Sequence, residues 1–87
     1  MDKEFHVYVL HSSKIDKIYT GHTNNLERRI IEHNAGLETS TKNKGHWILI
    51  HKEKFKTRSE AMKREKDLKT GKGRDFLRKF RPKKTAG

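Results

Sequence analysis

The chain contains no cysteine. A disulfide framework, a disulfide-linked partner and a cysteine-ligated zinc site are therefore excluded. The histidines do not replace them, because His6, His11, His22, His46 and His51 lack the spacing of a multi-histidine zinc site. Any metal bound by this chain is expected to rely on carboxylates.

Long apolar runs are also absent. No stretch approaches the roughly 18 to 20 residues that a membrane-spanning helix needs. The N-terminal residues Met1 to Glu4 lack the apolar core of a signal peptide. We therefore expect no membrane association and a cytoplasmic location.

Hydrophobic residues are scarce, at 30% of 87 residues, while 38% are charged. A chain of this length and composition predicts one domain with a modest core. We expect this domain to span residues 1–80. Pro82 and the lysines after it predict a basic, flexible tail over residues 81–87.

Acidic residues are few relative to basic ones, 11 against 22, which gives a net charge of +11. A small domain this basic usually meets a polyanion, because binding to phosphates releases counterions. The plainer interpretation is a surface that is merely soluble, but about half this charge would be enough for solubility. The charge therefore indicates a nucleic acid partner, with DNA as the expected one.

The first part of the chain predicts a β-hairpin. Residues 5–10 are apolar at nearly every position, which is typical of a central strand covered on both faces. A polar loop separates them from residues 18–20, a shorter and more polar run expected at a sheet edge. Gly21 is expected to end this second strand.

Two helices and a strand are predicted after the hairpin. The first helix covers residues 25–34, with Asn24 as its cap and a stripe of Leu26, Ile30 and His33 facing the sheet. Residues 46–55 predict the third strand. The capping box of Thr57 and Glu60 opens a helix that is expected to continue to Thr70.

The end of the chain predicts one more helix. Residues 71–73, Gly-Lys-Gly, are expected to break the second helix, and residues 74–80 to form a short third one. The resulting order is ββαβαα. It predicts an α+β fold with a small three-stranded antiparallel sheet flanked by helices.

Glu65 is the most informative residue of the second helix. The apolar stripe there is Ala61, Met62 and Leu68, and Glu65 lies on the same face. An acid in that position is costly unless it has a partner. The position alone leaves three interpretations open: a ligand or catalyst, an ion pair with an arginine, or a helix rolled enough to expose the carboxylate.

Four other residues allow a structural interpretation as well as a functional one. Arg29 alone would be an ordinary surface charge, and Tyr8 and Tyr19 are commonly core or rim aromatics. His33, one turn beyond Arg29, is either a packed histidine or a phosphate contact or proton shuttle. Two tyrosines on paired strands, near an arginine and a histidine on the next helix, are not a set that folding requires.

The arrangement resembles the GIY-YIG nuclease domain, and most closely its small single-domain members. The two triplets of the family correspond to residues 6–8, His-Val-Tyr, and 19–21, Tyr-Thr-Gly. Arg29 stands eight residues past Gly21, as in the family. Residues 26–34, 47–51 and 59–66 are also similar, so the resemblance covers roughly residues 5–70.

The resemblance implies a fold, an activity and a set of site residues. It implies a metal-dependent endonuclease that hydrolyses phosphodiester bonds in DNA, with Glu65 binding one Mg²⁺ or Mn²⁺ ion. Arg29 would hold the scissile phosphate, and its two parallel donors suit that role. One tyrosine would activate the attacking water; we favour Tyr19, with Tyr8 orienting it, although the sequence does not separate these roles. His33 is included because the family often has a histidine there.

The remaining positive charge is expected to hold the nucleic acid backbone without sequence specificity. The residues expected to do so are Lys17, Lys63, Arg64, Lys66, Lys69, Lys72 and Arg74. Two rivals stay open. The chain is alternatively a basic DNA- or RNA-binding module with the nuclease fold and little activity, or an interaction domain for an acidic protein. An intact set of Tyr8, Tyr19, Arg29 and Glu65 favours the nuclease.

Overall fold

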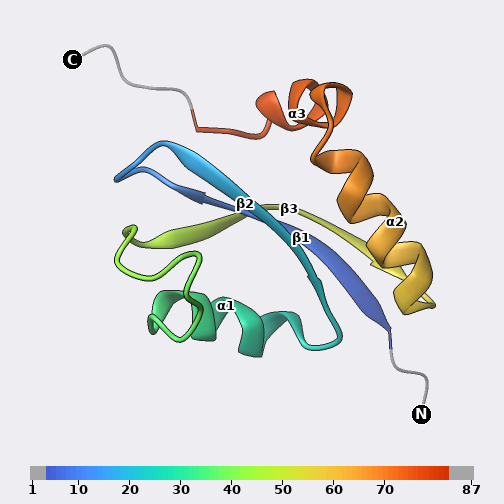
Figure 1. Cartoon of the computed structure of the whole chain (residues 1–87), viewed down its shortest axis with the longest axis horizontal. Coiled ribbons are helices and arrows are strands. Elements are labelled where there is room, and N and C mark those ends of the chain that lie inside the picture. Colours follow the sequence, from blue (N-terminus) through green and yellow to red (C-terminus); the bar gives the residue numbers. More distant parts are fainter. Residues whose placement is uncertain (1–3, 83–87) are drawn as a thin grey trace.

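The computed structural model describes residues 4–82, and the elements follow the order ββαβαα. Figure 1 shows the whole chain. The strands and helices are β1 (Phe5–Ser12), β2 (Lys17–Thr23), α1 (Leu26–Asn34), β3 (Trp47–Phe55), α2 (Arg58–Leu68) and α3 (Gly71–Arg78). The predicted α+β class and element order are confirmed.

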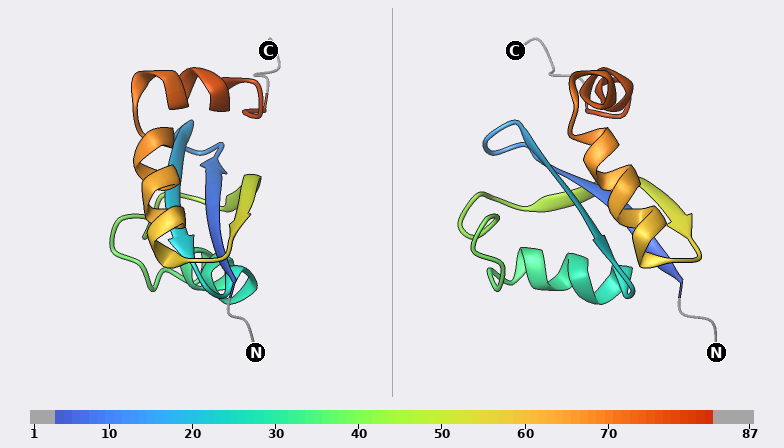
Figure 2. Two further views of the ribbon diagram at one scale, coloured as in Figure 1. Left: turned by 90° about the vertical axis from the view of Figure 1, so that its right-hand side faces the viewer. Right: turned by 45° about the vertical axis from the view of Figure 1, so that its right-hand side comes forward.

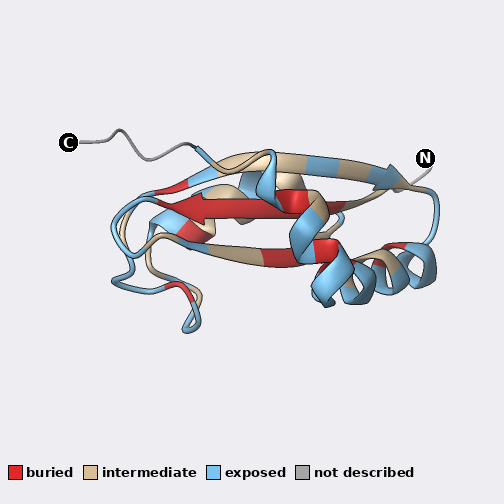
Figure 3. Cartoon of the chain, turned by 90° about the horizontal axis from the view of Figure 1, so that it is seen from above, coloured by how far each residue is buried: buried red, intermediate tan, exposed pale blue. Residues whose placement is uncertain are grey.

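The sheet has the strand order β2-β1-β3, and both pairings are antiparallel. The central strand is β1, as its apolar sequence predicts, and Figure 3 shows it buried along most of its length. The register places Tyr8 opposite Gly21 and Leu10 opposite Tyr19. The prediction that Gly21 ends the second strand is wrong, because β2 continues to Thr23.

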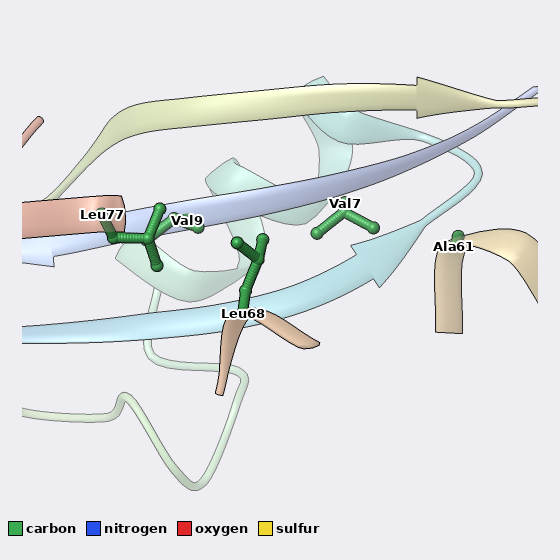
Figure 4. Close-up of a cluster of buried hydrophobic side chains, with 5 residues drawn as sticks. All are labelled: Val7, Val9, Ala61, Leu68 and Leu77. Atoms are coloured by element: carbon green, nitrogen blue, oxygen red, sulfur yellow. The ribbon is translucent and has the colours of Figure 1, made fainter. Parts of the chain in front are cut away.

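The two faces of the sheet carry separate clusters of side chains. Val7 and Val9 of β1 pack with Ala61, Leu68 and Leu77 from α2 and α3, as Figure 4 shows. The alternate residues of β1 point to the opposite face. There Tyr8 and Leu10 pack with Trp47 and, from α1, with Leu26 and Ile30. One face therefore belongs to α2 and α3, and the other belongs to α1.

Helix α1 starts one residue later than predicted. Its N-cap is Asn25, not Asn24, and the Asn25 side chain accepts a hydrogen bond from the backbone N–H of Arg28. The predicted stripe of Leu26, Ile30 and His33 does face the sheet, and His33 is almost completely buried. The helix therefore delivers His33 to the side chain of Tyr8.

Helix α2 has the predicted capping box, with Thr57 accepting from Glu60 N–H and the Glu60 carboxylate accepting from Thr57 N–H. Its buried face contains Ala61 and Leu68, but Met62 is 45% exposed. The predicted apolar stripe is therefore wrong at Met62. Position 62 is 100° around the helix from position 61, so the two residues cannot share a narrow face.

The glycines after α2 start a helix and do not break one. Thr70 is the N-cap of α3, and Gly71 and Gly73 lie in its first turn. A Cβ at Gly73 would lie 2.4 Å from Leu68 Cα, so only glycine allows the start of α3 to contact the end of α2 this closely. The prediction of a helix beginning at Arg74 is wrong for this reason.

The chain after α3 returns to the β1–β2 hairpin. Nη2 of Arg81 donates to both the carbonyl oxygen and the carboxylate of Asp16, at 2.7 Å each. The rest of the predicted tail, residues 83–87, lies outside the described residues. Within residues 4–82, no helix combines the length and apolar character needed to cross a membrane.

Candidate active site

Tyr8 occupies a position that Gly21 makes available. The two residues are partners in the β1–β2 register, and Tyr8 is only 1% exposed. A Cβ at Gly21 would lie 2.7 Å from the Tyr8 hydroxyl oxygen and 3.1 Å from Cε1 of Tyr19. The absence of a side chain at Gly21 therefore lets the Tyr8 ring cross the edge strand toward α1.

A chain of hydrogen bonds runs from Tyr8 through His33 to Thr41. The Tyr8 hydroxyl is 2.9 Å from Nε2 of His33, and Nδ1 of His33 is 2.8 Å from the hydroxyl oxygen of Thr41. The Thr41 hydroxyl donates to the carbonyl oxygen of Glu38, at 3.4 Å. Because the Thr41 hydroxyl proton is used in this bond, the Thr41 oxygen accepts a hydrogen bond from His33 Nδ1–H. His33 Nε2 then accepts a hydrogen bond from the Tyr8 hydroxyl.

Burial controls the protonation of this pair. Burial raises the pKa of Tyr8 to about 12, although the nearby Arg29 guanidinium acts in the opposite direction. Burial and the charge of Arg29 lower the pKa of His33. At neutral pH the pair is therefore a neutral phenol donating to a neutral imidazole.

Tyr19 completes a cluster of three rings. Its ring centroid lies 6.2 Å from that of Tyr8 and 4.7 Å from that of His33. Unlike Tyr8, Tyr19 is only partly buried. Of the two tyrosines, Tyr19 is the one that solvent reaches more easily.

Arg29 lies beside this cluster and is held by two carboxylates. Nη1 is 3.1 Å from Glu32, and Nη2 donates to Glu38. Burial alone would lower the pKa of Arg29, but the hydrogen bonds to Glu38, Tyr8 and Glu32 raise it above its usual value. The bonds to Arg29 also lower the pKa values of both acids. Arg29 is thus a fixed cation whose donors already bind anionic oxygens.

Sequence reasoning did not single out Glu32, Glu38 or Thr41. Glu32 has a signal, because it lies three residues after Arg29 on the same helix and such pairs are neighbours. Glu38 and Thr41 lie between α1 and β3, where the sequence shows no periodicity. Their contacts depend on how this loop folds back onto α1.

Glu65 extends from α2 to the edge strand. Its carboxylate is 2.6 Å from Nδ1 of His22 and 2.6 Å from Nζ of Lys69, and the side chain is 18% exposed. The partner of Glu65 is therefore a histidine and a lysine, not the arginine that the structural interpretation required. His22 pairs in register with Val7.

The structure brings four of the five predicted catalytic residues together. Tyr8, Tyr19, Arg29 and His33 gather on the α1 side of the sheet. Glu65 approaches from the α2 side and contacts His22, the residue after Gly21. Among residues 4–82, no hydrogen bond, ion pair or ring contact joins Glu65 to the other four. The link between the two groups is strand β2 itself.

Glu65 is suited to bind a magnesium ion whose other ligands would come from water and the substrate. Burial would raise the pKa of Glu65, but Lys69 and His22 lower it overall, so the carboxylate is ionised at neutral pH. The described residues contain no group of three His, Asp or Glu side chains that could enclose a metal. Mg²⁺ commonly binds one or two carboxylates together with water and substrate phosphates. The donor set therefore fits an open site, in which the ion would replace Lys69 at one carboxylate oxygen.

The predicted backbone-binding residues lie in different surroundings. Arg64 donates to both carboxylate oxygens of Glu53, at 2.9 and 3.0 Å, and Lys69 binds Glu65. Lys63 and Lys66 line a shallow hollow on the outer face of α2, and Lys72 is exposed in the first turn of α3. Lys17 and Arg74 line a hollow between the hairpin and α3.

Comparison with known proteins finds a family model and relatives that match most of this chain. The family model described as the GIY-YIG catalytic domain matches residues 4–80. UPF0213 protein SH2523 of Staphylococcus haemolyticus is 42% identical over 66 residues, covering 75% of this chain and 79% of the relative. UPF0213 protein NP_0776A of Natronomonas pharaonis is 41% identical over 71 residues, covering 80% and 82%.

A solved structure is also similar. The solution NMR structure of the UPF0213 protein BH0048 from Bacillus halodurans has a TM-score of 0.54 and 28% sequence identity. The match covers 87% of this chain and 83% of that one. The small, single-domain architecture is therefore shared with these proteins.

Proposed function

Because the chain belongs to the GIY-YIG nuclease family, we propose that it is a metal-dependent endonuclease that hydrolyses phosphodiester bonds in DNA. The proposed cleavage is directed by DNA structure or only weakly specific. The strands and helices of this domain occupy residues 5–78 of the described residues 4–82, so the described part of the chain holds no second module for tight sequence recognition.

The observation that carries the proposal is the buried contact between Tyr8 and His33 beside Arg29. Binding to a polyanion needs exposed cations, not a phenol hydrogen-bonded to an imidazole. Buried polar groups that neighbour a fixed cation are typical of sites that move protons near a charged substrate. The combination therefore supports catalysis over binding alone.

Arg29 is assigned to the scissile phosphate. Phosphodiester hydrolysis builds negative charge on the non-bridging oxygens, and a positioned guanidinium stabilises it with two parallel donors. In the free protein these donors bind Glu32 and Glu38. A phosphate that replaces Glu38 would keep the hydrogen bonds of Arg29 satisfied.

Tyr19 is assigned to the attacking water and Tyr8 to positioning. The lowered pKa of His33 keeps its Nε2 available as an acceptor, so the Tyr8 hydroxyl is fixed in one orientation. Tyr19 is the more accessible phenol and packs against the same imidazole. Nearby cations lower the pKa of a phenol toward a value useful for proton abstraction.

Glu65 is assigned to a single Mg²⁺ or Mn²⁺ ion. Such an ion, when bound, polarises the phosphoryl group and stabilises the leaving oxygen. His22 holds one oxygen of Glu65 and fixes the carboxylate at the edge of β2. Lys69, on the exposed side, is the partner that gives way.

A nucleic-acid-binding module with little activity is the second candidate. It is favoured by one observation, that Arg29 and Glu65 are both already paired within the chain. A protein that used these pairs only for folding would retain the basic surface and bind DNA or RNA without cutting it.

The test is a cleavage assay on a panel of DNA and RNA structures, with Mg²⁺, Mn²⁺ or EDTA. We expect cleavage of at least one DNA substrate with metal and none with EDTA. Glu65→Gln should abolish metal-dependent cleavage. Arg29→Ala should lower the rate by about 10²- to 10³-fold and keep most binding, because 21 of the 22 lysines and arginines remain.

Two neighbouring substitutions serve as controls. Arg28→Ala removes a 75% exposed arginine from the same helix, and Glu27→Gln removes an exposed acid from its first turn. Both should cut at the rate of the wild type. Cleavage that survives Glu65→Gln and Arg29→Ala in proportion to the folded fraction would exclude the proposed site. Binding by a wild type that cleaves none of the substrates would leave the binding module.

A further inference from the structure

Two adjoining hollows follow the exposed edge of β2. The first has a volume of about 290 Å³ and is lined by Asp16, Lys17, Ile18, Arg74, Arg78 and Arg81. The second, also about 290 Å³, is lined by Ile18, Tyr19, Thr20, Leu68, Lys69 and Arg74. Because Ile18 and Arg74 line both, the hollows form one groove, which we call the β2–α3 groove.

The charge of the first hollow is strongly positive. Four of its six lining residues are cations, and its one acid, Asp16, binds Arg81 and His11. Lys17 and Arg74 make no ion pair with any residue between 4 and 82. Arg78 contacts Asp75 at 3.1 Å, but both side chains are more than 70% exposed, and such pairs contribute little. The groove therefore presents cations that the fold leaves available.

The far wall of the groove is built by a specific contact. Arg81, three residues after α3, donates twice to Asp16 at the turn of the β1–β2 hairpin. Figure 2 shows α3 lying across this end of the sheet. The contact fixes the spacing between the hairpin and α3, so the cations face a site of defined width.

The other end of the groove leads to the candidate active site. Its second hollow is lined by Tyr19, the proposed proton acceptor, and by Lys69, whose Nζ binds Glu65. An anion bound by Arg74 would therefore lie next to Tyr19 and Lys69, in the same groove along β2. A single small anion would use only one of the hollows, whereas a polymer with a phosphate at each unit would use both.

We infer that the β2–α3 groove binds the phosphodiester backbone of one strand of the nucleic acid substrate, on one side of the scissile bond. The inference rests on the proposed function, which supplies the scissile bond. Arginine suits the role, because its planar fork of donors matches phosphate oxygens. The inference assigns Arg78 as a contact to the nucleic acid backbone, in addition to Lys17 and Arg74. It gives Arg81 the role of positioning α3 against the hairpin.

The experiment compares two variants that each remove two positive charges. Arg74→Gln/Arg78→Gln alters the groove. Lys52→Gln/Lys56→Gln is the control, because both lysines are exposed and lie in or just after β3, at the opposite edge of the sheet. Binding of a labelled single-stranded oligothymidine is measured in EDTA over a range of salt concentrations, so that cleavage plays no part.

We expect the groove variant to bind at least about tenfold more weakly than the control at low salt. Its slope of log affinity against log salt should fall by about 1.4, which is about 0.7 for each of two lost single-strand contacts. The melting temperatures of the two variants should agree. Equal affinities and slopes for the two variants would overturn the groove, whatever the wild type binds.

A competitor identifies the class of ligand. Polyglutamate should displace the oligonucleotide poorly, because its carboxylates are planar and lie at the ends of flexible side chains, whereas phosphates are tetrahedral and part of the backbone itself. Two results together would assign the groove to an acidic protein instead. Polyglutamate would compete as strongly as unlabelled oligothymidine, and the groove variant would lose this competition.

The groove and the nuclease proposal can fail separately. Groove-dependent binding by a protein that cleaves no substrate would keep the groove and remove the nuclease. If the groove variant cleaves with the KM of the wild type, while Glu65→Gln abolishes cleavage, the nuclease proposal stands and the groove proposal is wrong.

Discussion

Gly21 shows how one missing side chain fixes the position of a catalytic candidate. It lies inside β2, so its role is not to turn the chain but to make space for the Tyr8 ring. The second triplet of the sequence therefore contributes a tyrosine that faces the site and a glycine that admits the other tyrosine. This explains why the order and spacing of the triplets are informative although each alone is weak.

Gly21→Ala tests this packing. The new Cβ would overlap the Tyr8 hydroxyl, so we expect the free energy of unfolding to fall by about 1 to 3 kcal/mol, as in other overpacked cores. The measurement is urea unfolding of the single variants and of Tyr8→Phe/Gly21→Ala. The cost of the alanine should be smaller in the Tyr8→Phe background, because the closest atom is removed. An unchanged cost would place the strain elsewhere.

His33 predicts a pH dependence of stability. Its pKa is lowered in the folded protein by burial and by Arg29, so the unfolded chain binds more protons below about pH 6.5. The stabilisation from a neutral His33 is therefore complete above that value. It decreases as the pH falls from about 6.5 toward the folded pKa.

The measurement is the free energy of unfolding from pH 8 to pH 5 for the wild type and His33→Gln. Glutamine does not titrate, so the variant should show a shallower decrease, with a difference of up to about 1.4 kcal/mol per pH unit. The other histidines are common to both proteins and cancel in this comparison. Parallel curves would mean that His33 is protonated equally in the folded and unfolded states.

The junction of α2 and α3 depends on close contact between two helix ends. A Cβ at Gly73 would lie 2.3 Å from the carbonyl oxygen of Asp67 and 2.4 Å from Leu68 Cα, and backbone atoms cannot move aside as a flexible side chain can. At Gly71, in the same turn, a Cβ would meet nothing within 4 Å. The two glycines therefore share the first turn of α3, but only Gly73 lies where a side chain would clash with the backbone.

We expect Gly73→Ala to lower stability by at least about 2 kcal/mol, or about 8 °C or more in Tm for a domain of this size. Gly71→Ala should be neutral or slightly stabilising, since alanine favours a helix by up to about 1 kcal/mol over glycine. Thermal unfolding followed by circular dichroism checks both. If the two alanines cost the same, helix propensity and not the junction would determine the effect.

Local patterns in the sequence predicted the elements better than their junctions. The apolar run of β1 and the capping box of Thr57 were sufficient, because both signals are local. The start of α3 was not predictable, because glycine usually breaks a helix and its role here depends on a contact with Leu68. Asn24 and Asn25 are equivalent caps by composition, and only the backbone of the β2–α1 turn separates them.

In the candidate site, too, local patterns predicted some features and missed those that depend on tertiary contacts. Strand pairing and helix spacing predicted that Tyr8, Tyr19, Arg29 and His33 would meet, and they do. The helical face of Glu65 also indicated a partner. One of its partners, Lys69, is an i+4 neighbour on the same helix. The other partner, His22, and the loop acid that binds Arg29 depend on contacts over 43 and 9 residues of sequence. No periodicity encodes such contacts.

The charge of the whole molecule is organised by which cations the fold has already paired. Arg29, Arg64, Lys69 and Arg81 are engaged by carboxylates. The net charge of +11 therefore resides on other side chains, and three of these, Lys17, Arg74 and Arg78, line the β2–α3 groove. Paired cations shape the site, while unpaired ones remain free to replace counterions on a polyanion.

This division predicts that binding to DNA decreases steeply with salt. We expect the affinity to fall at least tenfold between about 50 and 200 mM salt, since each phosphate contact releases close to one counterion. A tenfold loss over a fourfold rise in salt needs a slope of about 1.7, which only about two contacts supply. Lys17, Arg74 and Arg78 alone exceed that number. Fluorescence anisotropy at several salt concentrations measures the slope, and a flat response would favour an acidic protein or a small ligand, because neither carries a condensed counterion layer.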